Sequence, residues 1–213
     1  MIYILYTSIN KDNHKRLVDD FLPKCSIEFQ DKIRRYRRWQ DAQLSLLGRV
    51  LLAKGVEQMN CTFDESELKY TSFNKPYFVN NGIHFNISHS GEVAICALTH
   101  LGDVGIDIEK TEATKVLDFK SQMTSNEWEL VNESKDSKLS FFNYWTQKEA
   151  VIKAHGNGLS IPLKSFEVQN NRTVIGSDNF FLKETIIKDD YCCHLALKKS
   201  LDTIEIRIKK ITL

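Results

Sequence analysis

The chain has 213 residues, 42% of them hydrophobic, and 29 basic residues nearly balance 28 acidic ones for a formal net charge of +1. This length suits one large domain or two small ones, and the charge excludes a chain that attracts polyanions over its whole surface. The five cysteines form no Cys-x-x-Cys pair, which favours reduced thiols over a zinc or disulfide framework. No segment approaches the roughly 20 apolar residues of a membrane span, so we expect a soluble cytoplasmic protein.

The first half of the chain is predicted to run from a strand through a long helical region into short strands. The apolar start MIYILY lacks a basic leader and turns polar at Thr7, which indicates a strand and not a signal peptide. From Ile33 to Gly55, apolar residues recur at three- and four-residue spacing, which predicts helix. Short strands are predicted at 68–72, 77–79, 84–88 and 93–98.

The second half repeats this order. A turn at 100–103 leads into the strand VGIDIEK at 104–110. Helices are predicted near 115–134 and 138–155, and strands near 166–169, 180–187, 191–198 and 203–212. We therefore expect an α+β fold of two similar lobes, 1–102 and 103–213, with the ligand site in the cleft between them.

The strand VGIDIEK places two carboxylates on one face. Side chains alternate along a strand, so Gly105, Asp107 and Glu109 share a face, with about 7 Å between the two carboxylate-bearing Cβ atoms. Like charges at this separation repel unless solvent or a cation lies between them, and Mg²⁺ prefers such oxygen ligands. A solvent-exposed face of an antiparallel strand explains the same pattern, so this motif alone does not decide.

The segment YWTQKEAVIKAHGNG predicts an amphipathic helix that ends at glycine. Trp145, Glu149 and Lys153 recur four residues apart and lie along one stripe of that helix. An ordinary surface ion pair between the last two explains the spacing as well as a site does.

A short strand, FNIS, precedes the predicted turn His89-Ser90-Gly91. Alternation directs Phe85 and Ile87 inward and leaves Asn86 and Ser88 outward. Neighbours on an extended chain point in opposite directions, so Ser88 and His89 do not form a nucleophile and base pair. We interpret His89 as a phosphate ligand, the alternative being a surface histidine.

The run DKIRRYRRW concentrates basic residues on a predicted helix, with Ile33, Tyr36 and Trp39 forming its apolar stripe. The basic residues are Lys32, Arg34, Arg35, Arg37 and Arg38. A solvated helix face, a phosphate-rich ligand and an acidic protein partner all fit this run. The near-neutral net charge and the lack of a nucleic-acid-binding module argue against nucleic acid.

Taken in order, the motifs NKP at 74–76, FNISHSG at 85–91, VGIDIEK at 104–110 and WTQKEAVIKAHGNGLSIPL at 145–163 resemble the 4'-phosphopantetheinyl transferases. The similarity is to the longer, surfactin-synthetase-activating type. It implies the 4'-phosphopantetheinyl transferase fold, a monomeric pseudo-dimer of two α/β lobes with the active site and coenzyme A between them. It further implies transfer of the 4'-phosphopantetheine group from coenzyme A to a serine of an apo acyl or peptidyl carrier protein, dependent on Mg²⁺, with release of adenosine 3',5'-bisphosphate.

The resemblance also implies roles for the second-half residues. Asp107, Glu109 and Glu149 would ligate Mg²⁺, Glu149 would act as the base, and Lys153 would stabilise the leaving group. Two alternatives remain for the same carboxylates: a Mg²⁺-dependent phosphohydrolase or nuclease, and a non-catalytic protein that binds carrier proteins.

In the first half, the resemblance implies contacts with coenzyme A. Lys75 and His89 would hold its phosphates, the backbone near Ser88 would line the nucleotide pocket, and Lys32 would reach the 3'-phosphate. The chain departs from the family at Asn74, where glycine is usual. Since Asn tolerates the left-handed backbone conformation better than most residues, we expect the turn to persist.

Overall fold

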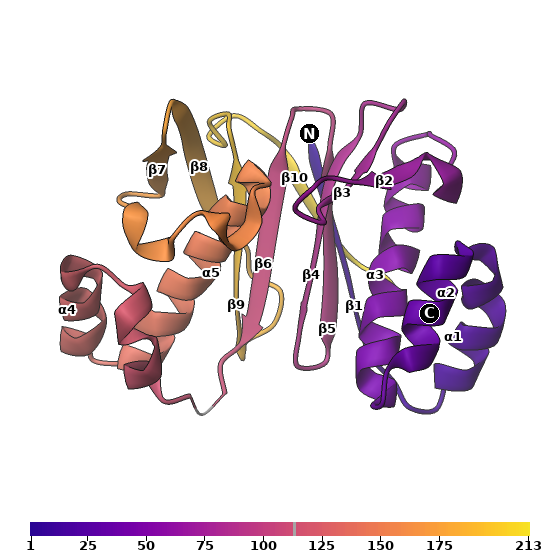
Figure 1. Cartoon of the computed structure of the whole chain (residues 1–213), viewed down its shortest axis with the longest axis horizontal. Helices are drawn as coiled ribbons and strands as arrows, with labels where there is room; N and C mark the ends of the chain where they lie inside the picture. The colour runs from indigo at the N-terminus through magenta and orange to yellow at the C-terminus, as the bar shows by residue number, and fades with distance from the viewer. Residues whose placement is uncertain (113) are drawn as a thin grey trace. The chain divides into compact units, whose positions relative to one another are not determined.

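The computed structural model describes residues 1–112 and 114–213, and the chain divides into two compact units (Figure 1). Unit 1 comprises Met1–His100 and Glu205–Leu213, and unit 2 comprises Leu101–Ile204. Each contains helices and a four-stranded sheet, so the predicted α+β class is confirmed. No helix in the described part of the chain is long and apolar enough to span a membrane.

The sheet of unit 1 has the strand order β10-β1-β5-β4. Strand β1 (Ile2–Ser8) runs antiparallel to β5 (Val93–Thr99), which pairs with β4 (His84–Ser90). On its other side β1 pairs in parallel with β10 (Ile206–Lys210). The prediction that the last strand belongs to the second lobe is therefore wrong, because a local pattern predicts a strand but not the sheet that receives it.

A two-stranded hairpin and several helices complete unit 1. The hairpin joins β2 (Leu68–Tyr70) to β3 (Pro76–Phe78). The helical segments are α1 (His14–Phe21), η1 (Leu22–Lys24), α2 (Ile27–Arg35), α3 (Trp39–Gln58) and η2 (Glu65–Glu67). Helix α3 is apolar on nearly all sides and packs against β5, β4 and β1, which is why it forms the centre of this unit's core.

The basic run does not form one helix. Helix α2 ends at Arg35, Tyr36 adopts an extended backbone with φ −63° and ψ 133°, and α3 begins at Trp39 after Arg38. The predicted stripe of Ile33, Tyr36 and Trp39 is thus divided between two helices. Apolar spacing continues across the break, so periodicity alone does not reveal it.

The sheet of unit 2 is antiparallel throughout, with the order β6-β9-β8-β7. Its strands are β6 (Val104–Lys110), β7 (Arg172–Ile175), β8 (Asp178–Glu184) and β9 (Tyr191–Leu197). Its helical segments are η3 (Val116–Gln122), α4 (Ser125–Glu133), α5 (Ser137–His155), η4 (Gly158–Ser160) and η5 (Leu163–Ser165). Helix α5 packs against β6 and β9 (Figure 1) and ends at Gly156, whose φ of 93° is left-handed, as glycine at this position predicts.

The strand predicted at 166–169 does not form. Only Gln169 pairs, through an isolated bridge to Arg172, and the two residues between them, Asn170 and Asn171, have positive φ angles. Asparagine tolerates this conformation, and the pair forms the tight turn that opens β7.

The same topology occurs in both units. The first strand, β1 or β6, pairs antiparallel with the last hairpin strand, β5 or β9, which pairs with the strand before it, β4 or β8. One long helix, α3 or α5, packs on each sheet. The predicted repetition of two similar α/β lobes is confirmed at the level of topology, with β10 as an addition to the first sheet.

Candidate active site

Strand β6 and helix α5 build the centre of the candidate site in unit 2. Gly105, Asp107 and Glu109 share one face of β6, as alternation predicts, but α5 covers that face. A Cβ atom on Gly105 would overlap the backbone of α5 at the Ala150 carbonyl oxygen and the Ala154 amide nitrogen. Asp107 is buried, with 2% of its surface exposed. The solvent-exposed interpretation of this face is therefore wrong for Asp107.

The ammonium of Lys153 lies directly on Asp107. Its Nζ atom donates to Oδ1 of Asp107 over 2.5 Å, and the lysine side chain remains 27% exposed. A buried carboxylate needs a charge partner, and in this structure Lys153 supplies one. The stripe of α5 predicted from the sequence therefore faces the carboxylate strand.

Glu149 lies one helical turn before Lys153 and is half-buried. Burial raises the pKa of its carboxyl above the ordinary value, nearby Lys153 lowers it, and the negative charge of Asp107 raises it further. The influence of Asp107 shows that these carboxylates of β6 and α5 interact electrostatically. A carboxyl with a raised pKa is a stronger base once it is ionised.

Trp145, the first residue of the stripe, is part of an aromatic cluster. Its ring centroid lies 5.2 Å from that of Phe119 and 5.9 Å from that of Phe141. These contacts agree with a packing role that supports α5.

The predicted coenzyme A residues lie in unit 1. Lys75 follows Asn74, whose φ of 60° is left-handed, so the expected turn persists without glycine. The turn is closed by hydrogen bonds from the Lys75 amide to Thr71 Oγ1, at 3.2 Å, and from the Thr71 amide to the Lys75 carbonyl, at 3.0 Å. Lys32 is exposed on α2, with its Nζ atom 6.0 Å from the ring centroid of Phe29.

Two predictions about the segment FNISHSG need correction. Strand β4 extends to Ser90, so His89 is an exposed strand residue and not part of the turn. Asn86 and Ser88 were expected to point outward into solvent, yet both are buried. Alternation predicts which side chains share a face, but not whether another segment covers that face.

Family models match both halves of the chain. A model for the N-terminal part of 4'-phosphopantetheinyl transferases matches residues 20–100, and the 4'-phosphopantetheinyl transferase superfamily model matches residues 103–207. The 4'-phosphopantetheinyl transferase gsp of Aneurinibacillus migulanus is 35% identical over 81% of this chain and 73% of its own length. The chain belongs to the 4'-phosphopantetheinyl transferase family.

Further relatives agree with this assignment. The 4'-phosphopantetheinyl transferase Sfp of Bacillus subtilis is 36% identical over 70% of this chain and 68% of its own length. The L-aminoadipate-semialdehyde dehydrogenase-phosphopantetheinyl transferase of Mus musculus is 32% identical over 66% of this chain and 51% of its own length. Membership confirms the resemblance read from the motifs, and the protein is a 4'-phosphopantetheinyl transferase rather than a phosphohydrolase or a non-catalytic binding protein.

The transferase also has a buried histidine beside the carboxylates that the sequence reasoning did not single out. His194 of β9 pairs in register with Asp107 of β6, and its Nδ1 lies 2.8 Å from Thr146 Oγ1 on α5. The Thr146 hydroxyl donates its single proton to the Phe142 carbonyl at 2.8 Å, so we assign the Nδ1 proton to His194, which donates to Thr146. Burial lowers the pKa of His194 to about 4, so the imidazole is neutral near pH 7.

This neutral histidine predicts a stability loss in acid. Its pKa in the folded protein is about 4, below the ordinary 6.5 of an exposed imidazole, so the unfolded chain takes up a proton that the folded protein refuses. The contribution of the neutral imidazole to the free energy of unfolding is therefore fully present well above pH 6.5. It decreases as the pH drops toward 4, by about 2 kcal/mol at pH 5. Urea unfolding of the wild type and His194→Gln at pH 7 and pH 5 measures this. The stability difference between them should shrink by about that amount, and a pH-independent difference would contradict the prediction.

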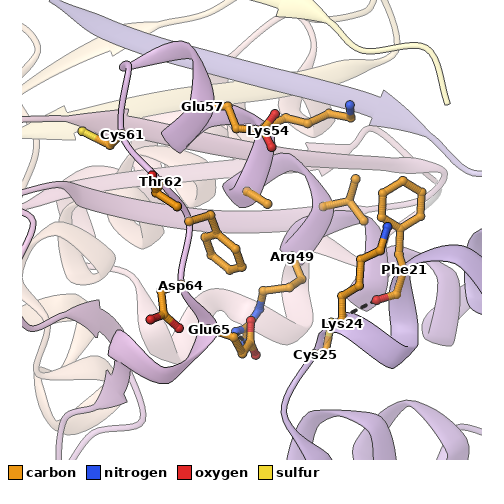
Figure 2. Close-up of a pocket in the computed structure, with 13 residues that line it drawn as sticks. Phe21, Lys24, Cys25, Arg49, Lys54, Glu57, Cys61, Thr62, Asp64 and Glu65 are labelled. Atoms are coloured by element: carbon orange, nitrogen blue, oxygen red, sulfur yellow. Dashed lines mark hydrogen bonds and ion pairs between the residues drawn. The ribbon is translucent and has the colours of Figure 1, made fainter.

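Unit 1 contains a cavity of about 710 Å³ that none of the predicted site residues lines (Figure 2). Among its lining residues, Arg49 Nη1 pairs with Glu65 Oε1 at 2.6 Å, and the guanidinium lies over Phe29, 4.5 Å from the ring centroid. Burial and the charge of Glu65 raise the pKa of the Cys25 thiol to about 11, so this cysteine is not a thiolate near pH 7. The ion pair of Arg49 and Glu65 attaches η2 to α3.

Proposed function

We propose that the enzyme transfers the 4'-phosphopantetheine group of coenzyme A to a serine hydroxyl of an apo acyl or peptidyl carrier protein, with Mg²⁺, and releases adenosine 3',5'-bisphosphate. The observation that supports this most directly is the group formed by Asp107, Glu149 and Lys153, in which a helix carrying a base and an ammonium covers a carboxylate strand. The same residue types are what attack by a hydroxyl on a pyrophosphate needs.

The donor set fits Mg²⁺. Asp107 and Glu109 lie on one face of β6, and Glu149 lies on the helix that covers it, so all three ligands are hard carboxylate oxygens. Burial is the main cause that raises the pKa of Glu149, and the negative charge of Asp107 raises it further, so a cation bound between these carboxylates would favour their ionised forms. Among the described residues no three such side chains are already grouped closely enough to hold a metal ion. We propose that side-chain rotation of the half-buried Glu109 and Glu149 completes the group.

When bound, Mg²⁺ would neutralise charge on the phosphoryl oxygens. Glu149 would accept the proton of the serine hydroxyl, and its raised pKa suits that task. Lys153 would donate to the oxygen of the departing phosphate. The 2.5 Å contact to Asp107 holds the lysine ammonium beside the carboxylates, on the same face of α5 as Glu149.

In unit 1, Lys75 and His89 would hold phosphates of coenzyme A, and Lys32 would reach the 3'-phosphate. The exposed positions of His89 and Lys32 and the ordered turn that carries Lys75 support this assignment. Ser88 would act through its backbone, because its strand β4 lies at the edge of the unit 1 sheet. These roles follow from the family motifs.

We also propose a monomer that works in the cytoplasm. Both repeats of the α/β topology occur in one chain, so the chain supplies each motif of the family without a second copy. In the described part of the chain all five cysteines are free, which suits a reducing compartment.

Removal of the metal tests the proposed chemistry. We expect EDTA to abolish release of adenosine 3',5'-bisphosphate and added Mg²⁺ to restore it. Loss of a residue that hydrogen-bonds to a metal ligand typically lowers metal affinity about 10- to 100-fold, and loss of a ligand itself should cost at least as much. We therefore expect Glu109→Gln to raise the half-saturating Mg²⁺ concentration by about tenfold or more. Glu112→Gln, on the exposed residue shortly after β6, is the matched control. Equal Mg²⁺ dependence in both variants would remove Glu109 from the ligand set.

A further inference from the structure

Helix α5 carries a buried lysine that the chemistry above does not use. The side chain of Lys148 is 1% exposed, and this residue directly precedes Glu149. Lysine is among the residues least often buried, and burial lowers its pKa here, while the neighbouring Glu127 carboxylate raises it. Burial of an ammonium is costly unless it is paired, so the contacts of Lys148 must offset that cost.

The ammonium contacts three oxygen atoms. Nζ pairs with Oε1 of Glu127 at 2.5 Å and donates to the carbonyl oxygens of Leu163, at 2.9 Å, and Phe166. It also lies 4.2 Å from the ring centroid of Phe166. These partners belong to α4, η5 and the segment after it, so one atom joins three parts of unit 2 to α5.

The partners are themselves fixed. Glu127 is the third residue of α4 and closes the capping box of that helix: its Oε2 accepts from the Thr124 amide at 3.0 Å, and its own amide donates to Thr124 Oγ1 at 3.2 Å. The Thr124 hydroxyl donates in turn to Glu167, and Asn126 donates to the same carboxylate at 3.1 Å. The ammonium of Lys148 therefore contacts a rigid polar network and not a mobile surface group.

A buried ion pair is weak evidence for a stabilising role, because well-packed apolar residues often serve stability equally well or better. This pair instead restrains the orientation of α5. The hydrogen bonds of Lys148 fix both the rotation of α5 about the helix axis and the position of α5 along that axis. The opposite side of α5 lies in backbone contact range of Gly105, where little movement is tolerated. Glu149 and Lys153 project between these two restraints.

We propose that Lys148 is a positioning residue, which holds α5 so that Glu149 and Lys153 meet the carboxylates of β6 in the reactive arrangement. This inference rests on the proposed roles of Glu149 and Lys153. It predicts that loss of the Lys148 network lowers kcat while the KM for coenzyme A stays nearly constant. A misplacement of about 1 Å can lower a rate by 100-fold, so we expect a decrease in kcat of about 10- to 100-fold.

The variants must separate position from stability. Lys148→Met alone leaves the Glu127 carboxylate buried without its partner and is expected to lose stability. The double variant Lys148→Met/Glu127→Gln removes both charges and keeps the capping box, since glutamine serves in that motif as glutamate does. Lys164→Met, an exposed lysine on η5, is the matched control. Thermal unfolding gives the folded fraction of each variant at the assay temperature, and steady-state kinetics of all variants are compared at that temperature.

Three outcomes decide the matter. A double variant with near wild-type thermal stability, a kcat at least tenfold lower and a KM for coenzyme A within about twofold supports the inference. A double variant with wild-type kcat overturns it, and so does a kcat that falls only in proportion to the unfolded fraction in either variant. Glu149→Gln is measured in parallel: if it keeps wild-type kcat while the double variant loses activity, the role of Glu149 fails and the positioning by Lys148 acts through Lys153.

Discussion

Glu149→Gln is expected to lower kcat for phosphopantetheine transfer by about two to four orders of magnitude, the usual contribution of a general base. Glutamine keeps the length and one oxygen of the side chain but does not accept the serine proton. Coenzyme A binding should change much less, because its phosphates are assigned to residues of unit 1. Stopped assays for the rate and calorimetry for coenzyme A binding measure the two effects separately.

The matched control is Glu129→Gln on the exposed surface of α4, which should keep wild-type activity. Full activity of Glu149→Gln would remove this residue from its role as base. A loss of coenzyme A binding equal to the loss in rate would instead make Glu149 chiefly a binding residue.

Gly105→Ala is expected to destabilise the protein by about 3 kcal/mol or more, at the upper end of the range for overpacking. The added Cβ would overlap the Ala150 carbonyl oxygen and the Ala154 amide nitrogen, and it would lie 3.0 Å from the carbonyl carbon of Lys153. These are backbone atoms of α5 and cannot rotate away. The helix must move off β6, and Glu149 and Lys153 move with it, so transfer activity should fall together with stability.

Gly48→Ala provides the comparison in a helix of unit 1. Its Cβ would lie 2.8 Å from Cγ2 of Ile87, so a side chain and not the backbone must shift, and alanine gains up to about 1 kcal/mol of helix propensity over glycine. We expect its urea midpoint to fall by much less than that of Gly105→Ala. If Gly105→Ala were as stable and active as Gly48→Ala, the close contact of α5 with β6 would not be essential.

The centre of the site was predictable because it combines the two-residue alternation of a strand with the four-residue spacing of a helix. Alternation in VGIDIEK places Asp107 and Glu109 on one face, and four-residue spacing places Glu149 and Lys153 on one stripe. Which face of the strand is covered does not follow from alternation. The available signal was Gly105, since glycine inside a strand often marks the close approach of another backbone.

Other features depend on tertiary pairing that the local sequence does not encode. His194 is a polar residue in the otherwise apolar strand YCCHLAL, but only the register with β6 places it opposite Asp107. The same holds for β10, whose pattern predicts a strand without naming β1 as its neighbour. The interruption of the helix at Tyr36 could not be predicted, because neither proline nor glycine marks that position.

The buried network around Lys148 shows a different limit. In the sequence, Lys148 precedes Glu149 on a helix and resembles a solvated residue, because lysine is mostly exposed. Its partners lie on α4, on η5 and directly after η5, too far along the chain for any periodicity to connect them. Such contacts become visible only when the fold is known.

Intact-mass spectrometry of apo carrier proteins tests the central claim most directly. A panel of apo acyl and peptidyl carrier proteins is incubated with the enzyme, coenzyme A and Mg²⁺, with EDTA in a parallel series and Glu149→Gln as the inactive control. The account predicts that at least one carrier gains the mass of one phosphopantetheine group, only with wild-type enzyme and Mg²⁺. No gain on any carrier, with the enzyme folded and coenzyme A bound, would contradict it.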